Sequence, residues 1–370
     1  MRLLTDAEVR AARMRSVLLT PHVQNSPLDV VEWMGALQSQ DAASGQWSVG
    51  VRVAGARDEV VHEAFERGEI LRTWPMRSTI HTIPAIDAHW MLALTGVRGL
   101  DQMRTRRQQL GLLPQDMEAA LAVIAAALSG GRLLSRADLL AEVQDSGIAV
   151  NGQRGYHLLL YASQVGLTCM GPQRGTSQTF ALLDEWVPRP RLLTRDESLV
   201  ELAYRYVRSH GPASMKDLAG WTGLTLTDVR AGVAGNDGRL VGVGAGADAR
   251  WLTAELAEVI ADGSLAAHEV VALPGYDEYL LGYKDRSLHG DATLLEKVVP
   301  GGNGVFRSTV VADGVVVATW TRTLSASGAR ISVTPINRLS AGLRSASVRA
   351  LERYAAFLGR DPEIRFESAT

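Results

Sequence analysis

The chain has 370 residues, of which 46% are hydrophobic and 21% charged, and its formal net charge at pH 7 is −2. A near-neutral chain has no bulk positive field that would draw it to nucleic acid or a membrane, and its single cysteine, Cys169, excludes an internal disulfide and a cysteine-rich zinc site. No apolar run reaches the roughly 18 residues of a membrane span, and the first residues lack the apolar core of a signal peptide. We therefore expect a cytoplasmic, soluble protein of about two or three folding units.

The first 115 residues have the pattern of short helices with strand insertions. A Thr-x-x-Glu capping box at Thr5 predicts a helix to about residue 18, and Ser26 before a proline predicts a second helix. The β-branched run 47–53 predicts a short strand. The run 70–84 predicts two strands on either side of Pro75.

Two later segments share one order of elements. Residues 117–183 predict three helices followed by a hairpin, and residues 196–253 predict the same order over a similar length. Three helices and a hairpin are the elements of a winged helix. The run Pro-Arg-Pro-Arg at 188–191 predicts the linker between the two segments.

The pattern changes to strands in the last third of the chain. Asp313-Gly314 between two β-branched runs is a strong hairpin signal, and Ser327-Gly328 predicts a second hairpin. One helix is expected near the end, at about 343–358. The sequence therefore predicts an α+β protein. Its predicted units are 1–115, 116–190, 191–260 and a β-rich unit with a terminal helix at 261–370.

Five segments, in one order along the chain, carry a resemblance to a known family. They are WMGALQSQDAA (33–43), LRTWPMRSTIHTI (71–83), SHGPASMKDLAGWTGL (209–224), LPGYDEYLLGYKDRS (273–287) and ADGVVVATW (312–320). In them the chain resembles the AlkZ-type bacterial DNA glycosylases. The resemblance implies three tandem winged helices in a C shape followed by a terminal β-barrel. It also implies excision of alkylated purines from duplex DNA; some members unhook interstrand crosslinks, and several protect antibiotic producers from their own product.

The resemblance implies an active site of two glutamines separated by one residue that is usually apolar. Gln38 and Gln40 match the glutamines, and Ser39 departs from the apolar form. Side chains two residues apart point to different sides of a helix but to the same side of an extended chain. The two glutamines can therefore act together only if the helix before them has ended.

The chemistry of an amide suits this type of reaction. An amide is no strong base, but its carbonyl accepts a hydrogen bond from water and its NH₂ group donates one. An N7-alkylguanine is cationic and leaves readily, so its excision needs orientation and electrostatics more than acid–base strength. From spacing alone, the favoured interpretation is that Gln38 and Gln40 cap a helix and bind solvent; the resemblance reverses this order in favour of a catalytic role.

Further candidates lie in two predicted hairpins. Arg72, Arg77 and His81 follow the glutamine motif on a strand pair, where they either contact phosphate or substrate or belong to a solvated hairpin. Arg322 and Arg330 lie in the hairpin 321–332, which the resemblance suggests as one that enters a DNA groove. The resemblance implies that the run Asp277–Glu278–Tyr279 is a structural joint against the third winged helix; the alternative is that it lines the cleft.

The reaction is expected to stop at base release. Strand-cutting glycosylases use an amine nucleophile, and none of the three lysines lies close in sequence to the glutamine motif. No metal or cofactor motif is present, so we expect neither. The expected partner is alkylated double-stranded DNA, bound by a monomer. Two other functions remain open: a non-catalytic winged-helix DNA-binding or regulatory protein, and a scaffold that sequesters the alkylating compound.

Overall fold

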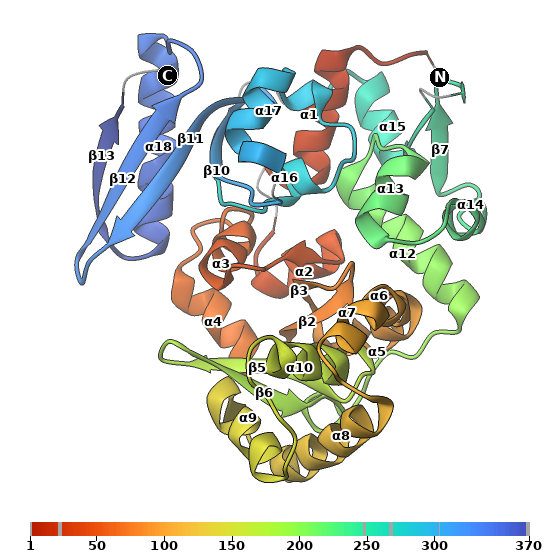
Figure 1. Cartoon of the computed structure of the whole chain (residues 1–370). Helices are drawn as coiled ribbons and strands as arrows, with labels where there is room; N and C mark the ends of the chain where they lie inside the picture. Colours follow the sequence, from red (N-terminus) through yellow and green to blue (C-terminus); the bar gives the residue numbers. More distant parts are fainter. Residues whose placement is uncertain (1, 21–23, 247–248, 266–268, 303, 368–370) are drawn as a thin grey trace. The chain divides into compact units, whose positions relative to one another are not determined.

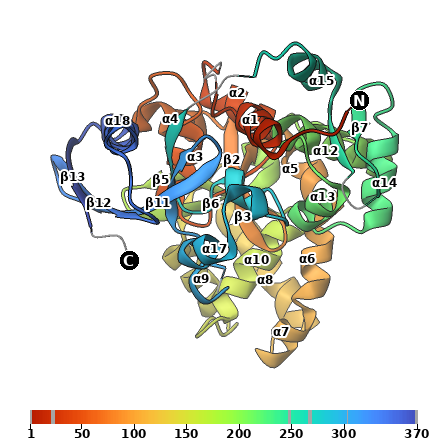
Figure 2. The same cartoon turned by 90° about the horizontal axis from the view of Figure 1, so that it is seen from above.

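The computed structural model describes residues 2–20, 24–246, 249–265, 269–302 and 304–367, which form an α+β protein (Figures 1 and 2). The chain packs into two compact units. Unit 1 comprises Met1–Val61, Val200–Trp221 and Thr225–Thr370, and unit 2 comprises His62–Leu199 and Thr222–Leu224. These two units are defined by packing and combine separate segments of the chain, so they do not test the four consecutive units that the sequence predicts. Within the described residues, no helix is long and apolar enough to cross a membrane.

Unit 1 begins with helices whose starts follow the predicted caps. Thr5 and Glu8 form the capping box of the first helix, and the Ser26 side chain accepts a hydrogen bond from Asp29 N at the start of the second. The elements of this part are α1 (Asp6–Ser16), α2 (Pro27–Met34), β1 (Leu37–Gln38), α3 (Ala42–Gly50) and α4 (Asp58–Glu66). Both predicted helices are confirmed.

The strand predicted at 47–53 is wrong, because these residues form the second half of α3 and the turn after it. The Asp41 side chain caps this helix by accepting from Ser44 N. Trp47 then packs on the rings of Tyr354 and Phe357, with centroids 5.2 and 5.0 Å away. These long-range contacts outweigh the β propensity of the run, because strand preference depends mainly on the packing that a site offers.

The terminal part of unit 1 is a five-stranded sheet in the order β13-β12-β11-β10-β9. Neighbouring strands are antiparallel except β12 and β13, which are parallel. The strands are β9 (Val270–Leu273), β10 (Ser308–Ala312), β11 (Val315–Leu324), β12 (Gly328–Pro335) and β13 (Asp361–Phe366). Asp313 and Gly314 both have positive φ, 50° and 79°, as the predicted hairpin turn requires. Both predicted hairpins are confirmed.

Two expectations for this region differ from the structure. In the described residues, β9 and β13 are the edges of an open sheet and do not pair, so the strands do not close a barrel. Helix α18 (Ala341–Phe357), which is the predicted last helix, packs against both edge strands. The region also contains more than the one predicted helix, namely α16 (Glu278–Leu281), α17 (Ala292–Val298) and 3₁₀ turns at Ser287–His289 and Pro300–Gly302. The short capped turns carry too few periodic residues for a sequence pattern to show them.

The order of elements predicted for 196–253 is confirmed. The helices are α12 (Arg195–His210), α13 (Met215–Thr222) and α14 (Leu226–Ala234), followed by the hairpin β7 (Leu240–Val243) and β8 (Arg250–Thr253) and then α15 (Ala254–Ala261). The predicted turn between β7 and β8 lies partly outside the described residues. The assignment of these elements as a winged helix stays a prediction.

Unit 2 holds an antiparallel sheet in the order β3-β2-β5-β6-β4. Its strands are β2 (Ile70–Met76), β3 (Thr79–Pro84), β4 (Leu134–Ser135), β5 (Thr168–Arg174) and β6 (Ser177–Leu182). Its helical segments are a 3₁₀ turn (Ala85–Asp87), α5 (Ala88–Met91), a π-helical turn (Leu92–Gly96), α6 (Val97–Gln102), α7 (Arg104–Gln109), α8 (Pro114–Leu128), α9 (Arg136–Asp145), α10 (Arg154–Gln164) and α11 (Leu183–Trp186). The order predicted for 117–183 is confirmed. Cys169 on β5 is fully buried, and burial raises the pKa of its thiol to about 12.

Candidate active site

The QSQ segment (Gln38–Ser39–Gln40) lies on non-helical chain between α2 and α3. Helix α2 ends at Met34, and Gly35 follows with a φ of 77°, a conformation that glycine adopts without strain. Gln38 is the last residue of β1, with 7% of its surface exposed, and Gln40 is exposed. The two glutamines can act together only if the preceding helix has ended, and α2 does end before both of them.

Ser39 is packed into the interior between the two glutamines. It is 1% exposed, and its hydroxyl donates to Leu37 O at 3.2 Å. A Cβ atom at Gly45 would lie 2.5 Å from Ser39 Oγ, so Gly45 leaves the room in which the serine side chain sits. A small polar residue thus fills the place that the family usually gives to an apolar one.

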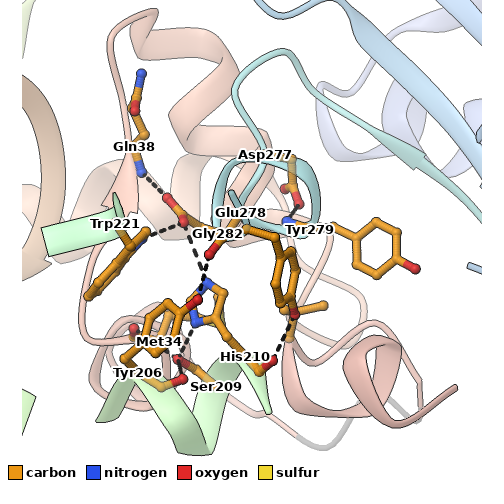
Figure 3. A network of polar contacts seen from close by, with 12 residues as sticks. Met34, Gln38, Tyr206, Ser209, His210, Trp221, Asp277, Glu278, Tyr279 and Gly282 are labelled. Carbon is orange, nitrogen blue, oxygen red and sulfur yellow. Dashed lines mark hydrogen bonds and ion pairs between the residues drawn. The ribbon is translucent and has the colours of Figure 1, made fainter. Parts of the chain in front are cut away.

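Glu278, the first residue of α16, connects to the main chain of the QSQ segment (Figure 3). Its Oε1 accepts a hydrogen bond from Gln38 N at 2.7 Å, and its Oε2 accepts one from Trp221 Nε1 at 2.8 Å. The Nε2 atom of His210 lies 3.5 Å from the same Oε2. The sequence interpretation of 277–279 as a structural joint gave no sign of this contact, since Gln38 and Glu278 are 240 residues apart and no spacing rule joins them.

The neighbouring carboxylate, Asp277, holds the helix that follows the QSQ segment. Arg52 contacts it through two hydrogen bonds, Nη1 to Oδ2 and Nη2 to Oδ1, each 2.8 Å long. Ser48 of α3 donates to Asp277 Oδ2 at 2.9 Å. Both charged groups are buried, so each depends on the other for its solvation.

Of the two candidate arginines on the β11–β12 hairpin, Arg322 is brought to the QSQ segment. Its Nη2 lies 3.6 Å from Oδ1 of Asp41, the residue directly after the glutamine motif, and its guanidinium lies 5.5 Å from the ring centre of Tyr354. Burial raises the pKa of Tyr354 to about 12. Arg330 is 60% exposed and pairs with Glu363 on β13, with Nε 2.9 Å from Oε2. Sequence reasoning found Arg322 but missed Asp41.

The other three candidates lie on the β2–β3 hairpin of unit 2. Arg72 is 9% exposed and donates to Gln178 Oε1 on β6. His81 is fully buried, with Nδ1 3.0 Å from Thr79 O and Nε2 3.5 Å from Nη2 of Arg77. These contacts lie within unit 2. A role of the three residues on DNA or substrate stays a prediction.

Among the described residues, no group of three or more His, Cys, Asp or Glu side chains is arranged to hold a metal ion. Around the extended segment the described residues offer the glutamine amides, the Ser39 hydroxyl, the Arg322 guanidinium and the carboxylates of Asp41 and Glu278. Such groups can orient a water molecule and stabilise charge, but they include no strong base at the two glutamine positions.

Comparison with known proteins assigns the class of protein that this fold and site define. A family model described as "DNA glycosylase AlkZ-like" matches residues 31–357. The chain therefore belongs to the AlkZ-like DNA glycosylase family, as the five segments predicted, and DNA repair is the process in which this family acts.

A relative and a solved structure, both from Streptomyces sahachiroi, are similar to this chain. One, named an interstrand DNA cross-link repair glycosylase, is 26% identical over 328 residues, which are 85% of this chain and 86% of the relative. The other is the solved structure of DNA glycosylase AlkZ, with a TM-score of 0.82 and 23% identity over 99% of this chain and 100% of that one. At this identity the structural likeness shows the shared fold.

Proposed function

We propose that the protein is a monofunctional DNA glycosylase that hydrolyses the N-glycosidic bond of bulky N7-alkylguanine adducts or interstrand crosslinks in duplex DNA. The observation that carries the proposal is the QSQ segment, which holds Gln38 and Gln40 on non-helical chain between two capped helices. The name of the Streptomyces sahachiroi relative, an interstrand cross-link repair glycosylase, supports this substrate class.

The two amides act on water rather than on the leaving base. A glutamine carbonyl accepts a hydrogen bond from the water, and a glutamine NH₂ group donates one to its oxygen, which orients the lone pair that attacks the sugar carbon. The bond from the sugar carbon to the cationic base breaks, and the base leaves with both electrons as a neutral purine. The water oxygen bonds to the sugar carbon and releases one proton to solvent, which leaves a hydroxyl group. Since the base is a good leaving group, orientation supplies most of the rate.

The reaction stops at an abasic site with an intact strand. Strand cutting would need an amine that forms a Schiff base with the sugar. The chain has three lysines, Lys216, Lys284 and Lys297, and all of them follow the QSQ segment by more than 170 residues. Lys216 and Lys284 line a pocket together with Asp217 and Asp285, and the lining of that pocket includes no residue of the QSQ segment, which supports base release by hydrolysis alone.

The DNA duplex is held by arginines on the β11–β12 hairpin. Arg322 lies beside the QSQ segment through Asp41, and Arg330 is exposed on the neighbouring strand. A near-neutral chain binds phosphates by gathering its cations on one surface. We propose that the protein works as a monomer in the cytoplasm, and that its biological role is resistance to a DNA-alkylating natural product.

The test is base release from a panel of duplexes that carry single N7-alkylguanine adducts or a crosslink. We expect release of the modified base, with strand breaks only after alkali treatment. Binding without release would indicate a regulatory DNA-binding protein. Consumption of the free alkylating compound without any action on DNA would indicate a scaffold that sequesters it. Direct strand breaks would contradict the monofunctional reaction.

A further inference from the structure

The chain that leads from α2 into the QSQ segment is held at its first end by α12. The last carbonyls of a helix have no partners within the helix. Arg208 of α12 donates from Nη2 to Glu32 O at 2.7 Å and to Trp33 O at 2.8 Å. Ser209 Oγ lies 3.4 Å from Met34 O, the last carbonyl of α2. The end of α2 is therefore fixed to the end of α12.

The same chain is held at its other end by Glu278. The carboxylate is fully buried and accepts from the main-chain nitrogen of Gln38 and from the indole of Trp221, which is 1% exposed. Figure 3 shows the Gln38 side chain directed away from this contact. The hydrogen bond thus fixes the backbone from which the amide projects.

His210 joins the two ends. Its Nδ1 lies 2.8 Å from Ser209 Oγ, and its Nε2 lies 3.5 Å from Glu278 Oε2. The Ser209 hydroxyl also donates to Arg205 O at 2.7 Å, so it connects the imidazole ring to the main chain of α12. The ring is stacked on Tyr206, with centroids 4.6 Å apart, so its position is defined by packing as well.

Holding the QSQ segment with a buried carboxylate carries an unfavourable free energy of desolvation. Removing it from water is unfavourable, and well-packed apolar residues often give equal or greater stability. Charge-assisted hydrogen bonds are, however, shorter and stronger than neutral ones, so they define a geometry more tightly. The Glu278 carboxyl group, which accepts a hydrogen bond at each of its two oxygens, therefore suits a role in orientation rather than in stability.

We propose that Glu278, held by Trp221 and His210, is a positioning residue that fixes the backbone of the QSQ segment and so sets the orientation of the Gln38 amide. This inference rests on the proposed function for its effect on catalysis. A misplacement of about 1 Å costs an oriented reaction on the order of 100-fold in rate. The hydrogen bond from Gln38 N to Glu278 prevents such a displacement of the segment.

The main variant is Glu278→Gln, which keeps the shape of the side chain. The new amide can offer its oxygen to Gln38 N–H only by turning its NH₂ group toward Trp221 Nε1–H, so two donors face each other. We expect the single-turnover rate of base excision to fall about 10- to 100-fold, with the dissociation constant for DNA changed by less than about threefold. We also expect faster amide hydrogen exchange across residues 35–40.

A second substitution relieves that conflict. Adding Trp221→Phe removes the competing donor and leaves the amide oxygen for Gln38 N–H. Compared with Trp221→Phe alone, the double variant should recover about fivefold or more of the lost rate and most of the exchange protection. A role in stability alone would give no such recovery.

The matched control is Asp87→Asn in unit 2. Asp87 is fully buried and accepts from Trp90 Nε1 at 2.7 Å, as Glu278 does from Trp221, and it lies 3.7 Å from Nη1 of Arg191. This change should lower the melting temperature, as Glu278→Gln does. It should leave both the excision rate and the exchange of residues 35–40 at wild-type values.

Two results would overturn the inference. One is unchanged exchange of residues 35–40 in Glu278→Gln; the other is faster exchange with an unchanged excision rate. If the wild-type protein releases no base from any adduct, the proposed function fails separately. The hydrogen-exchange comparison of Glu278→Gln with Asp87→Asn then decides whether Glu278 fixes the segment.

Discussion

The QSQ segment of unit 1 and the β2–β3 hairpin of unit 2 both carry candidate polar residues on extended chain, but their contacts use different atoms. At Gln38 the hydrogen bond to Glu278 uses the main-chain nitrogen. At Arg72 and His81 the hydrogen bonds to Gln178 and Thr79 use the guanidinium and the imidazole themselves.

The two kinds of contact have different consequences for the residues that make them. A contact through a main-chain atom fixes the position from which the side chain projects. A contact through the polar atoms of the side chain uses those atoms to stabilise the fold, so they are less available to DNA or substrate. On this reasoning, substitutions in the QSQ segment change mainly the rate of reaction, and substitutions in the β2–β3 hairpin change mainly stability.

The largest expected effect is that of the double variant Gln38→Ala, Gln40→Ala. Excision of an N7-alkylguanine from duplex DNA should slow by on the order of 100-fold or more, while DNA binding changes little, because a water-positioning amide contributes mainly in the transition state. Gln40→Glu, which keeps the shape, should retain more activity than Gln40→Ala. Single-turnover kinetics measure both, and full activity of the double variant would remove the two residues from the mechanism.

The next effect is on stability in unit 2. Arg72→Met removes the donor that Gln178 Oε1 has in the wild type, and a hydrogen bond to a charged group contributes about 1.5–3 kcal/mol. We expect the free energy of unfolding, measured by urea denaturation, to fall by that amount. If the variant instead loses DNA affinity with a smaller salt dependence, Arg72 contacts phosphate as the sequence predicted.

Acidification tests the core beside α16 in unit 1. Burial first, and the nearby charge of Arg13 second, lower the pKa of His289 to about 3. Its unfolded pKa is about 6.5, so below that value the unfolded chain binds a proton that the folded protein refuses, and stability falls as pH decreases toward 3. Between pH 7 and 5, the free energy of unfolding should decrease by about 2 kcal/mol more in the wild type than in His289→Gln. Equal losses in both proteins would contradict this cause.

The smallest effects are expected from single arginines of the β11–β12 hairpin. Binding to undamaged duplex should be weak and steeply dependent on salt, and each lost phosphate contact lowers the slope of log affinity against log salt by about 0.9. Arg322→Gln and Arg330→Gln should each show this decrease. Arg67→Gln in unit 2, which breaks exposed ion pairs with Glu63 and Glu69, serves as the control and should leave the slope unchanged.

Local signals in the sequence predicted much of the secondary structure. The caps at Thr5 and Ser26 each accept the expected backbone hydrogen bond, because a cap depends on residues three positions apart. The strand predicted at 47–53 failed because Trp47 is placed by Tyr354 and Phe357, some 300 residues further along the chain. The β-strand propensity of individual residues does not reflect such long-range contacts.

The candidate site divides in the same way. The motif identified Gln38 and Gln40, and the requirement that the helix end before them follows from geometry alone. The partners Glu278, Trp221 and His210 could not be inferred, because tertiary folding brings them together and no periodicity relates them. The hairpin arginine Arg322 was found through the resemblance, but its link to Asp41 needed the structure.

The burial of Cys169 has a consequence for the protein in the presence of electrophiles. If the protein acts on alkylated DNA, as we propose, it meets the electrophiles that alkylate DNA, and thiolates attack such electrophiles readily. Cys169 is the only cysteine of the chain, it is fully buried, and its thiol has a pKa of about 12, so almost none of it is thiolate at neutral pH. The folded protein thus hides its most reactive nucleophile, and a cysteine introduced at Ser325, in the turn between β11 and β12, would be the one thiol that a fluorescent maleimide reaches.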